Sequence, residues 1–150
     1  MKLTNNFFLQ EFIPSGIFKR WGNLSTWYID DRLPHLAQFF RDRFQKPIMI
    51  NTWPYVDIAG TNYCGYRPAN CHVGASKSQH KFGRAIDISI EDFDLECVYR
   101  DIIKHKKLYF DQGIRGLEEF KKTKTWVHLD MRNSQSDEIF IFLRYFWRIF

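Results

Sequence analysis

Residues 78–90 read SQHKFGRAIDISI, and the rest of the chain is organised around this stretch. Its second half alternates as a half-buried strand does: isoleucines at positions 86, 88 and 90 fall on one face, and Asp87 falls on the other. His80 comes earlier, before Gly83, whose flexibility lets the chain turn into the strand. The stretch therefore predicts an imidazole and a carboxylate on the polar side of a sheet, which is two thirds of a three-ligand zinc site.

A second stretch, residues 126–132, repeats this pattern and reads WVHLDMR. Apolar residues at positions 127, 129 and 131 form one face, and His128, Asp130 and Arg132 share the polar face with Trp126. If both stretches are strands of one sheet over one core, His128 and Asp87 emerge on the same side. The sequence thus offers a third ligand for the site.

Two histidines and one carboxylate hold zinc with a fourth position open for water, whose pKa the metal lowers towards about 7. We therefore predict one zinc ion, Zn²⁺, bound by His80, Asp87 and His128. Each histidine taken alone is explained as well by an ordinary hydrogen-bonded side chain, so the prediction rests on the three residues together. The other histidines share no such pattern and are predicted to be ordinary side chains.

Together these residues resemble a known family. The pattern Ser-x-His-x-x-Gly-x-Ala-x-Asp at 78–87, followed by Trp-Val-His-Leu-Asp at 126–130, is similar to the zinc D-alanyl-D-alanine carboxypeptidases. Relatives of that family include the phage L-alanyl-D-glutamate endopeptidases and the hedgehog-type domains. The chain looks most like the small single-domain members of phages and prophages, and the similarity runs from about residue 6 to residue 133.

The resemblance implies roles for further residues. Arg67 matches the position whose guanidinium holds the substrate near the metal, where a planar fork of donors binds a carboxylate or stabilises an oxyanion. Tyr66 and Trp126 are expected to contact the substrate as well. Ser78 and Gln79 either orient the substrate or satisfy backbone groups of the turn.

The chain departs from the family pattern at the general base. Active relatives carry a glutamate three residues before the last ligand, or a histidine two before it, and here those positions are Thr125 and Trp126. Two other carboxylates are candidates for this role: Glu118 on the preceding predicted strand, and Asp130 one pleat from His128. Asp130 is explained equally well as a carboxylate that orients a ligand histidine. We rank Glu118 first, because small phage relatives share the missing base and an acidic residue near that place.

Length and composition indicate one well-packed domain spanning residues 1–150. Aromatic residues make up 18% of the chain, including 15 phenylalanines, which excludes a disordered protein. The formal net charge of +5 suits an anionic partner such as a nucleic acid, a membrane surface or a cell wall. No nucleic-acid-binding motif occurs, so a nucleic acid is not the expected partner.

The three cysteines form no Cys-x-x-Cys pair, which argues against a thiolate zinc site. They are read as reduced thiols, although Cys64 and Cys71 flank a loop and can pair if oxidised. The first six residues lack the apolar core of a signal peptide, and no run of about 18 apolar residues occurs. We expect no membrane span and a protein made in the cytoplasm of a bacterial host, acting at the cell wall in phage lysis or as part of a virion.

Hydrophobic spacing and turn residues predict the remaining elements. Helices are predicted at residues 14–21, from the cap at 30–31 to 46, and from Asp92 or Asp94 to about 106. Strands are predicted at 48–53 and 113–120, with a basic turn leading into the His128 strand and a long loop at 54–78 that forms one wall of the cleft. Residues 137–150 combine a strand-like part at 139–143 with a helix-like part at 144–148. They are predicted to be a final packing element, and the alternative is an exposed aromatic tail that serves as an interaction surface.

We therefore predict an α+β domain with a small, mainly antiparallel sheet, helices packed on one face and a zinc site on the other. The resemblance implies the hedgehog and D-alanyl-D-alanine peptidase type of fold. It also implies a zinc metallopeptidase that hydrolyses an amide bond in peptidoglycan stem peptides. The alternative is a catalytically impaired, zinc-binding phage structural or wall-binding module, which the missing base favours.

Overall fold

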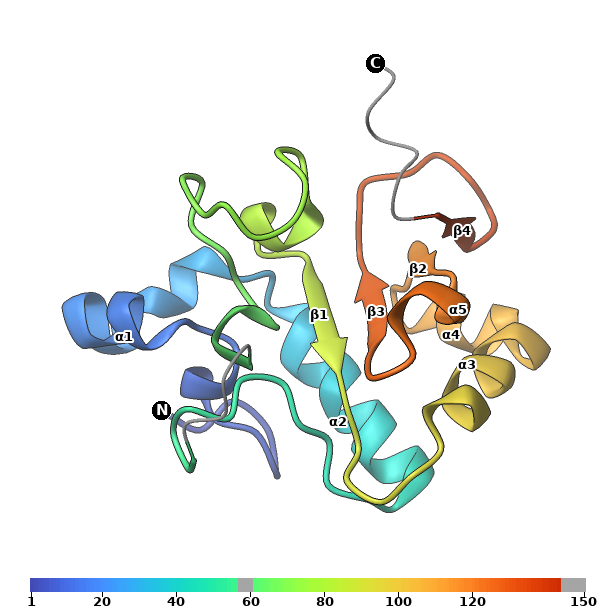
Figure 1. The fold of residues 1–150 in the computed structure, drawn as a ribbon, viewed down its shortest axis with the longest axis horizontal. Helices are drawn as coiled ribbons and strands as arrows, with labels where there is room; N and C mark the ends of the chain where they lie inside the picture. Colours follow the sequence, from blue (N-terminus) through green and yellow to red (C-terminus); the bar gives the residue numbers. More distant parts are fainter. Residues whose placement is uncertain (57–60, 144–150) are drawn as a thin grey trace.

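Four strands form one sheet at the centre of the fold in the computed structural model, which describes residues 1–56 and 61–143 (Figure 1). The sheet order is β1-β3-β2-β4, built from Ala85–Ile88, Val127–Asp130, Gly116–Glu118 and Phe140–Phe142 in that order. β3 lies between β1 and β2 and is antiparallel to both, whereas β4 runs parallel to β2. The predicted α+β class is confirmed, and the sheet is mixed, with one parallel pair.

Alternation along the strands gives the sheet one apolar and one polar face. Ile86 and Ile88 of β1 and Leu129 of β3 are fully buried in the main core. The helices α2 (Arg32–Phe44) and α3 (Leu95–Lys104) contribute Leu36, Phe40, Val98 and Ile102 to the same core cluster. Figure 1 shows α2 passing behind β1, so the helices cover the apolar face and leave the other face for polar side chains.

The helices begin and end where their flanking residues allow. α1 (Ser15–Trp21) follows Pro14 and ends at Gly22, and a 3-10 helix, η2 (Gly22–Tyr28), continues the chain. The start of α2 is held by Asp30, whose carboxylate accepts the Arg32 backbone N–H, and its end is marked by Gln45 in the left-handed region. Shorter helices are η1 (Leu9–Glu11), η3 (Thr61–Tyr63), η4 (Gln79–Phe82), α4 (Lys106–Asp111) and α5 (Phe120–Thr123).

The strand predicted at residues 48–53 was wrong. Within this segment only Met49 forms a β-type pair, an isolated antiparallel bridge to Ser89, the residue that follows β1. Beyond it the chain bonds to the N-terminal segment, because the Asn51 N–H donates to the Glu11 carbonyl and the Trp53 indole N–H donates to the Ile13 carbonyl. These partners lie far away in sequence, and strand propensity carries no information about them.

Three other predicted elements are shorter or different in the structure. The helix predicted from residue 92 or 94 starts after Asp94, as expected, but divides at His105 into α3 and α4. The strand predicted at 113–120 is reduced to β2, and the basic turn before β3 contains α5. The strand-like part at 139–143 contains β4, whereas residues 144–150 lie outside the described residues. Among the described helices none has the length and apolar character needed to cross a membrane.

One polar network, with exposed and partly exposed members and one buried tyrosine, connects three helices. The Arg43 guanidinium of α2 donates to both oxygens of Asp101 in α3, with Nε–Oδ2 and Nη2–Oδ1 distances of 2.5 and 2.8 Å. The hydroxyl of Tyr109 in α4, a fully buried residue, donates to the same carboxylate. The bond from Arg43 is the main reason that the pKa of Asp101 is lowered from its ordinary value. The network therefore stabilises the packing of α2, α3 and α4 when Asp101 is ionised.

We predict that Asp101→Asn lowers the free energy of unfolding by about 1–3 kcal/mol at pH 7, measured by urea denaturation, because it removes hydrogen bonds to a charged group. Since the folded-state pKa of Asp101 is lowered, its contribution is complete above the unfolded-state pKa of about 4 and is lost as pH falls through the folded-state pKa. The difference between variant and wild type should therefore shrink in strong acid.

Asp111→Asn is the matched control for this prediction. Asp111 accepts an exposed bond from Lys107 one helical turn earlier, at 3.1 Å, and such a pair contributes about 0.5 kcal/mol or less. Equal losses of stability in the two variants at pH 7 would contradict the role assigned to the Asp101 network.

Candidate metal centre

The sheet register brings Asp87 and His128 together. They are direct cross-strand partners in the antiparallel pair of β1 and β3, and both side chains emerge on the polar face. Side chains of directly opposed residues start only about 5 Å apart at Cβ, so a carboxylate and an imidazole at these positions meet. Both residues are buried.

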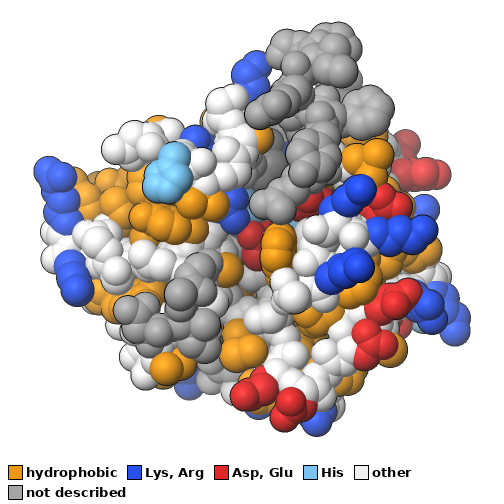
Figure 2. Space-filling view, in the orientation of Figure 1, with side chains coloured by type: hydrophobic (Ala, Val, Ile, Leu, Met, Phe, Trp, Pro, Cys, Tyr) orange, Lys and Arg blue, Asp and Glu red, His pale blue; other side chains and the backbone are white. Residues whose placement is uncertain are grey.

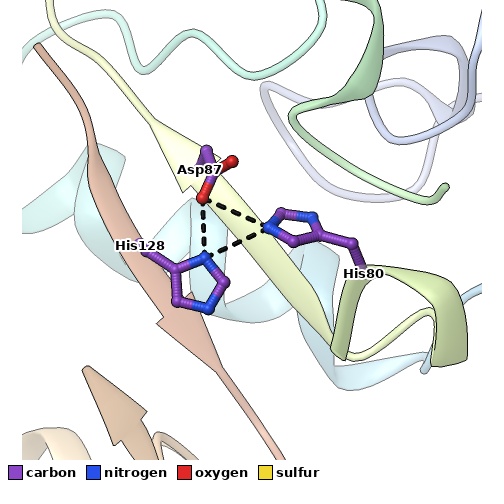
Figure 3. Close-up of side chains that lie close together, drawn as sticks. All are labelled: His80, Asp87 and His128. Carbon is purple, nitrogen blue, oxygen red and sulfur yellow. Dashed lines mark hydrogen bonds and ion pairs between the residues drawn. The ribbon is translucent and has the colours of Figure 1, made fainter. Parts of the chain in front are cut away.

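His80 reaches the same place from the turn before β1. It lies in η4, and the chain then passes through Gly83, whose φ of 66° is in the left-handed region. A side chain at Gly83 would also overlap the Tyr28 carbonyl oxygen, so glycine is required there for both space and conformation. Figure 3 shows the His80, Asp87 and His128 side chains pointing toward one another from the turn and the two strands.

The three side chains have the spacing of a tetrahedral metal site. His80 Nε2 lies 3.2 Å from Asp87 Oδ1 and 3.1 Å from His128 Nδ1, and that Nδ1 lies 2.7 Å from the same Oδ1. Zinc bonds of about 2.0–2.1 Å in a tetrahedron place neighbouring donor atoms roughly 3.3 Å apart. The buried His80, Asp87 and His128 group can therefore hold a metal ion, and its two nitrogens and one oxygen suit zinc.

Each histidine is oriented by a second partner on its other ring nitrogen. His80 Nδ1 lies 2.7 Å from the Gly65 carbonyl oxygen, which can only accept, so Nδ1 carries the proton and Nε2 is available as a ligand. On His128 the outward nitrogen, Nε2, lies 3.4 Å from Asp130 Oδ2, and Nδ1 faces the cluster. Partners of this kind fix the tautomer and the ring direction of metal-binding histidines.

Arg67 fixes the third ligand. Its Nη2 donates to Asp87 Oδ2 at 2.7 Å, and its Nε donates to the Tyr63 carbonyl oxygen at 2.6 Å. One carboxylate oxygen of Asp87 is thereby engaged by the guanidinium, which leaves Oδ1 facing the two histidines. The Asp87 backbone N–H is held as well, by the Cys64 carbonyl oxygen at 2.7 Å.

The electrostatics of the cluster follow from this geometry. Burial lowers the pKa of His80, whose nearest acceptor on Nδ1 is uncharged. Burial opposes ionisation of Asp87, but His80 and His128 outweigh it and lower the pKa of that carboxyl. Burial also opposes a charge on His128, yet its bonds to Asp130 and Asp87 outweigh this and raise its pKa to about 9. Carboxylates on both sides therefore favour positive charge at the His128 position, whether from a proton or from a metal ion.

Asp130 supports His128 and is shielded from solvent. It is completely buried, and Arg132 holds both of its oxygens at 2.8 and 2.5 Å. Gly116 of β2 is its cross-strand partner, and a Cβ at Gly116 would overlap the Asp130 carboxylate. Burial opposes ionisation of Asp130, but Arg132 and His128 outweigh it and lower the pKa. Asp130 is therefore built as an orienting carboxylate.

The cluster opens into a cavity of about 490 Å³, a size typical of small-ligand sites. Most of the residues singled out from the sequence line it: Arg67, Ser78, Gln79, His80, Asp87, Glu118, Trp126, His128 and Asp130. Glu118 is buried and lies in β2, which pairs with β3 on the side away from β1. Continuing the pairing of β2 with β3 by one residue brings Glu118 opposite His128, on the polar face.

Tyr66 is the one candidate that does not line the cavity. Its ring stacks on Tyr28, with ring centroids 5.0 Å apart, so its placement does not support a role in substrate binding. The loop at 54–78 does form a wall of the cavity. Its lining residues include Thr61, Tyr63, Val73, Gly74, Ala75, Lys77 and Ser78. Residues 57–60 of this loop lie outside the described residues.

Two contributors to the site were missed in the sequence. Asn51 accepts the backbone N–H groups of Cys64 and Gly65 at 2.9 and 3.3 Å, and so holds the two carbonyls that position Asp87 and His80. Phe142 of β4 lines the cavity and meets the His128 ring edge to face, with centroids 5.7 Å apart. Asn51 gave no signal, because its partners are backbone groups of a distant loop. The strand-like composition of residues 139–143 was visible, but the pairing of β4 with β2 was not.

We predict that the protein binds about one equivalent of zinc through His80, Asp87 and His128. Metal analysis after dialysis should show a steep loss of zinc in His80→Ala and in His128→Ala, because each removes one of three ligands. His35→Ala, an exposed residue of α2, is the control and should keep its zinc. Wild-type zinc content in both ligand variants would refute the assignment.

We further predict that Asp130→Asn weakens zinc affinity by about ten- to a hundredfold without abolishing it, because it removes the carboxylate that orients His128. Gly116→Ala should act in the same direction by displacing that carboxylate. Competition with a chromogenic chelator measures both affinities. Unchanged affinity in the two variants would show that Asp130 does not support the metal centre.

Comparisons of this chain with protein-family models, with curated proteins and with solved structures gave no match. The function must therefore be argued from the residues and the geometry of the site itself.

Proposed function

We propose that the protein is a zinc metallopeptidase that hydrolyses an amide bond in peptidoglycan stem peptides, with a fold of the hedgehog and D-alanyl-D-alanine peptidase type. The observation that carries the proposal is the buried His80, Asp87 and His128 group at the base of the 490 Å³ cavity. The donor set contains three protein ligands, as catalytic zinc sites do, whereas structural zinc sites have four.

When bound, a zinc ion would act as a Lewis acid that polarises an amide carbonyl and lowers the pKa of water to about 7. Glu118 is the proposed general base: its carboxylate takes a proton from the attacking water and delivers it to the leaving amine nitrogen. Water is thereby consumed, the C–N bond breaks, and a carboxylic acid and an amine are released. Glu118 supports this role because it lines the cavity on the same sheet face as His128.

Asp130 is less suited to be the base. Its two oxygens are held by Arg132, and it lies on the far side of the His128 ring from the other two ligands. A carboxylate held in this way has a lowered pKa and is a poor proton acceptor. In the proposed reaction Asp130 keeps His128 in place, and Arg67 keeps one oxygen of Asp87 directed at the cluster.

The cell-wall substrate is proposed from the family resemblance of residues 78–87 and 126–130 and is compatible with the surface. The protein has a net charge of +5, which favours anionic polymers. Figure 2 shows Lys and Arg side chains spread around the edge of one face, with Asp and Glu among them on the side of α3 to α5. On the face drawn, the described Lys and Arg side chains form no continuous basic stripe of the kind that tracks a nucleic-acid backbone. Action at the wall during phage lysis or as part of a virion belongs to the same proposal.

A second candidate function is a catalytically impaired, zinc-binding structural or wall-binding module. It is favoured by Thr125 and Trp126, which line the cavity and cannot accept a proton in the way a glutamate does. The two functions differ in turnover and share the metal centre, so one assay separates them.

We predict that purified protein clears a zymogram of purified bacterial cell wall. Clearing should disappear with a chelator and return when zinc is restored, because the ligands must hold the metal for hydrolysis. Mass spectrometry of the released fragments identifies the amide bond. A wild-type protein that carries one equivalent of zinc and leaves every wall preparation intact would exclude the peptidase and favour the structural module.

The cell-wall hydrolysis assay also tests Glu118 as the general base. Glu118→Gln keeps the size of the side chain but cannot accept the proton, so turnover should fall by about a hundredfold or more while zinc content and fold are retained. Glu119→Gln is the matched control: the neighbouring residue lies outside the cavity wall and should leave turnover unchanged. Normal turnover in Glu118→Gln would remove Glu118 from the mechanism.

A further inference from the structure

A second cavity, of about 280 Å³, lies between the N-terminal segment, α2 and the chain that follows Pro47. Figure 1 shows the N-terminal segment beside the chain that follows α2, away from β3. Its described wall contains polar side chains, and three of them have complementary chemistry: Glu11, Arg41 and Asn51. Asn6, Thr52 and Tyr55 are the other polar residues of this wall. None of the residues that line it is a ligand of the proposed metal.

Two opposite charges face this cavity without neutralising each other. Glu11 is only 6% exposed, and Arg41 is half-buried. Within the described part of the chain neither forms an ion pair, with the other or with a third residue, and Arg41 Nη1 is buried without a hydrogen-bond partner. Unpaired buried charges are unfavourable, and proteins retain them mainly where a ligand or partner completes them.

Two hydrogen bonds keep the Glu11 carboxylate in place, and neither comes from a cation. The Phe8 backbone N–H donates to Glu11 Oε1 at 2.8 Å, which caps η1, and the Tyr55 hydroxyl hydrogen-bonds the same carboxylate. Burial raises the pKa of Glu11, as expected for a carboxyl group that lacks a cation. A bound ammonium group would supply that cation.

Asn51 adds an unpartnered donor that is 99% buried. Its Oδ1 accepts from the backbone of Cys64 and Gly65, whereas its Nδ2 is buried with no partner. Asn51 lines the second cavity and does not line the first, and its amide nitrogen is the polar atom of this side chain that still lacks a partner. The cavity thus presents two donors from Arg41 and Asn51, a carboxylate acceptor, and apolar walls from Phe7, Pro47, Ile48, Met49 and Val56.

We propose that this cavity binds a small zwitterion, a free aliphatic amino acid or a short peptide, with its carboxylate on Arg41 and Asn51 and its ammonium group on Glu11. A simple anion would leave Glu11 without a cation and place two negative charges in one cavity, whereas a cation would leave Arg41 and Asn51 without acceptors. A zwitterion satisfies all three groups, and an aliphatic side chain fits the apolar walls. The volume of 280 Å³ limits the ligand to a few residues at most.

Isothermal titration calorimetry on the zinc-loaded protein tests this with L-leucine, D-leucine and the dipeptide Ala-Leu as probes. Saturable binding is expected for at least one of them. N-acetylleucine lacks the ammonium group and leucinamide lacks the carboxylate, so both should bind at least about tenfold more weakly, as expected when buried charged partners are left unpaired. The proposal is overturned if no zwitterion binds at concentrations well above about 1 mM, or if the two blocked derivatives bind equally well.

Variants assign the binding to this cavity. Glu11→Gln keeps the acceptor for the Phe8 N–H, and Arg41→Met keeps the apolar stem; each should weaken binding about tenfold or more. Asn51 is left unchanged, because it also supports the metal centre. Arg100→Met, in an exposed pair on α3, is the control and should bind normally.

Two outcomes of the variant series contradict the assignment. The first is wild-type affinity for the zwitterion in both Glu11→Gln and Arg41→Met. The second is binding that is lost in His80→Ala but kept in Arg41→Met, because this would place the zwitterion at the proposed metal site. If the cavity variants fail to fold, the blocked derivatives on the wild-type protein decide the question alone. Because the second cavity shares no ligand with the metal centre, this result is independent of hydrolysis of the cell wall.

Discussion

The polar face of the sheet depends on one interaction, the cross-strand contact of Asp87 with His128, whose Oδ1 and Nδ1 atoms lie 2.7 Å apart. A buried carboxylate beside a buried imidazole is unfavourable unless every remaining polar atom is engaged. The structure meets this demand with a row of alternating charges. Arg67 holds the outer oxygen of Asp87, and Asp130, itself held by Arg132, lies beyond the His128 ring.

This row explains why apparently unrelated parts of the chain converge on the site. The loop after residue 60 supplies Arg67 and the backbone carbonyls of Cys64 and Gly65, which fix Asp87 and His80. β2 supplies Gly116 opposite Asp130, where a Cβ would overlap the Asp130 carboxylate. The His80, Asp87 and His128 group is therefore held in place by its surroundings, and its donor atoms have a spacing that can hold a metal ion.

Much of the scaffold could be predicted because it follows local rules. The helix at 32–44 repeats apolar residues at helical spacing, and the strands at 85–88 and 127–130 alternate strictly, so their apolar faces were readable. The prediction of a strand at 48–53 was wrong because this segment pairs with distant residues. Asn51 and Trp53 hydrogen-bond to the N-terminal segment about forty residues away, and these bonds outweigh strand propensity. The break of the predicted helix at His105 had no signal in the periodicity, which continues across it.

The sequence by itself determined which side chains share a face, because the two-residue period of a strand sends Asp87 away from the isoleucines and His128 with Asp130 away from Val127 and Leu129. It also determined the turn at Gly83 that returns His80 to that face. Only the tertiary structure decided the register that places Asp87 opposite His128 and the burial of Asp130 behind the His128 ring. It also decided that the Tyr66 ring stacks on Tyr28 and does not line the cavity. Register, burial and partners at long sequence separation depend on how the whole core packs, and no local pattern contains that information.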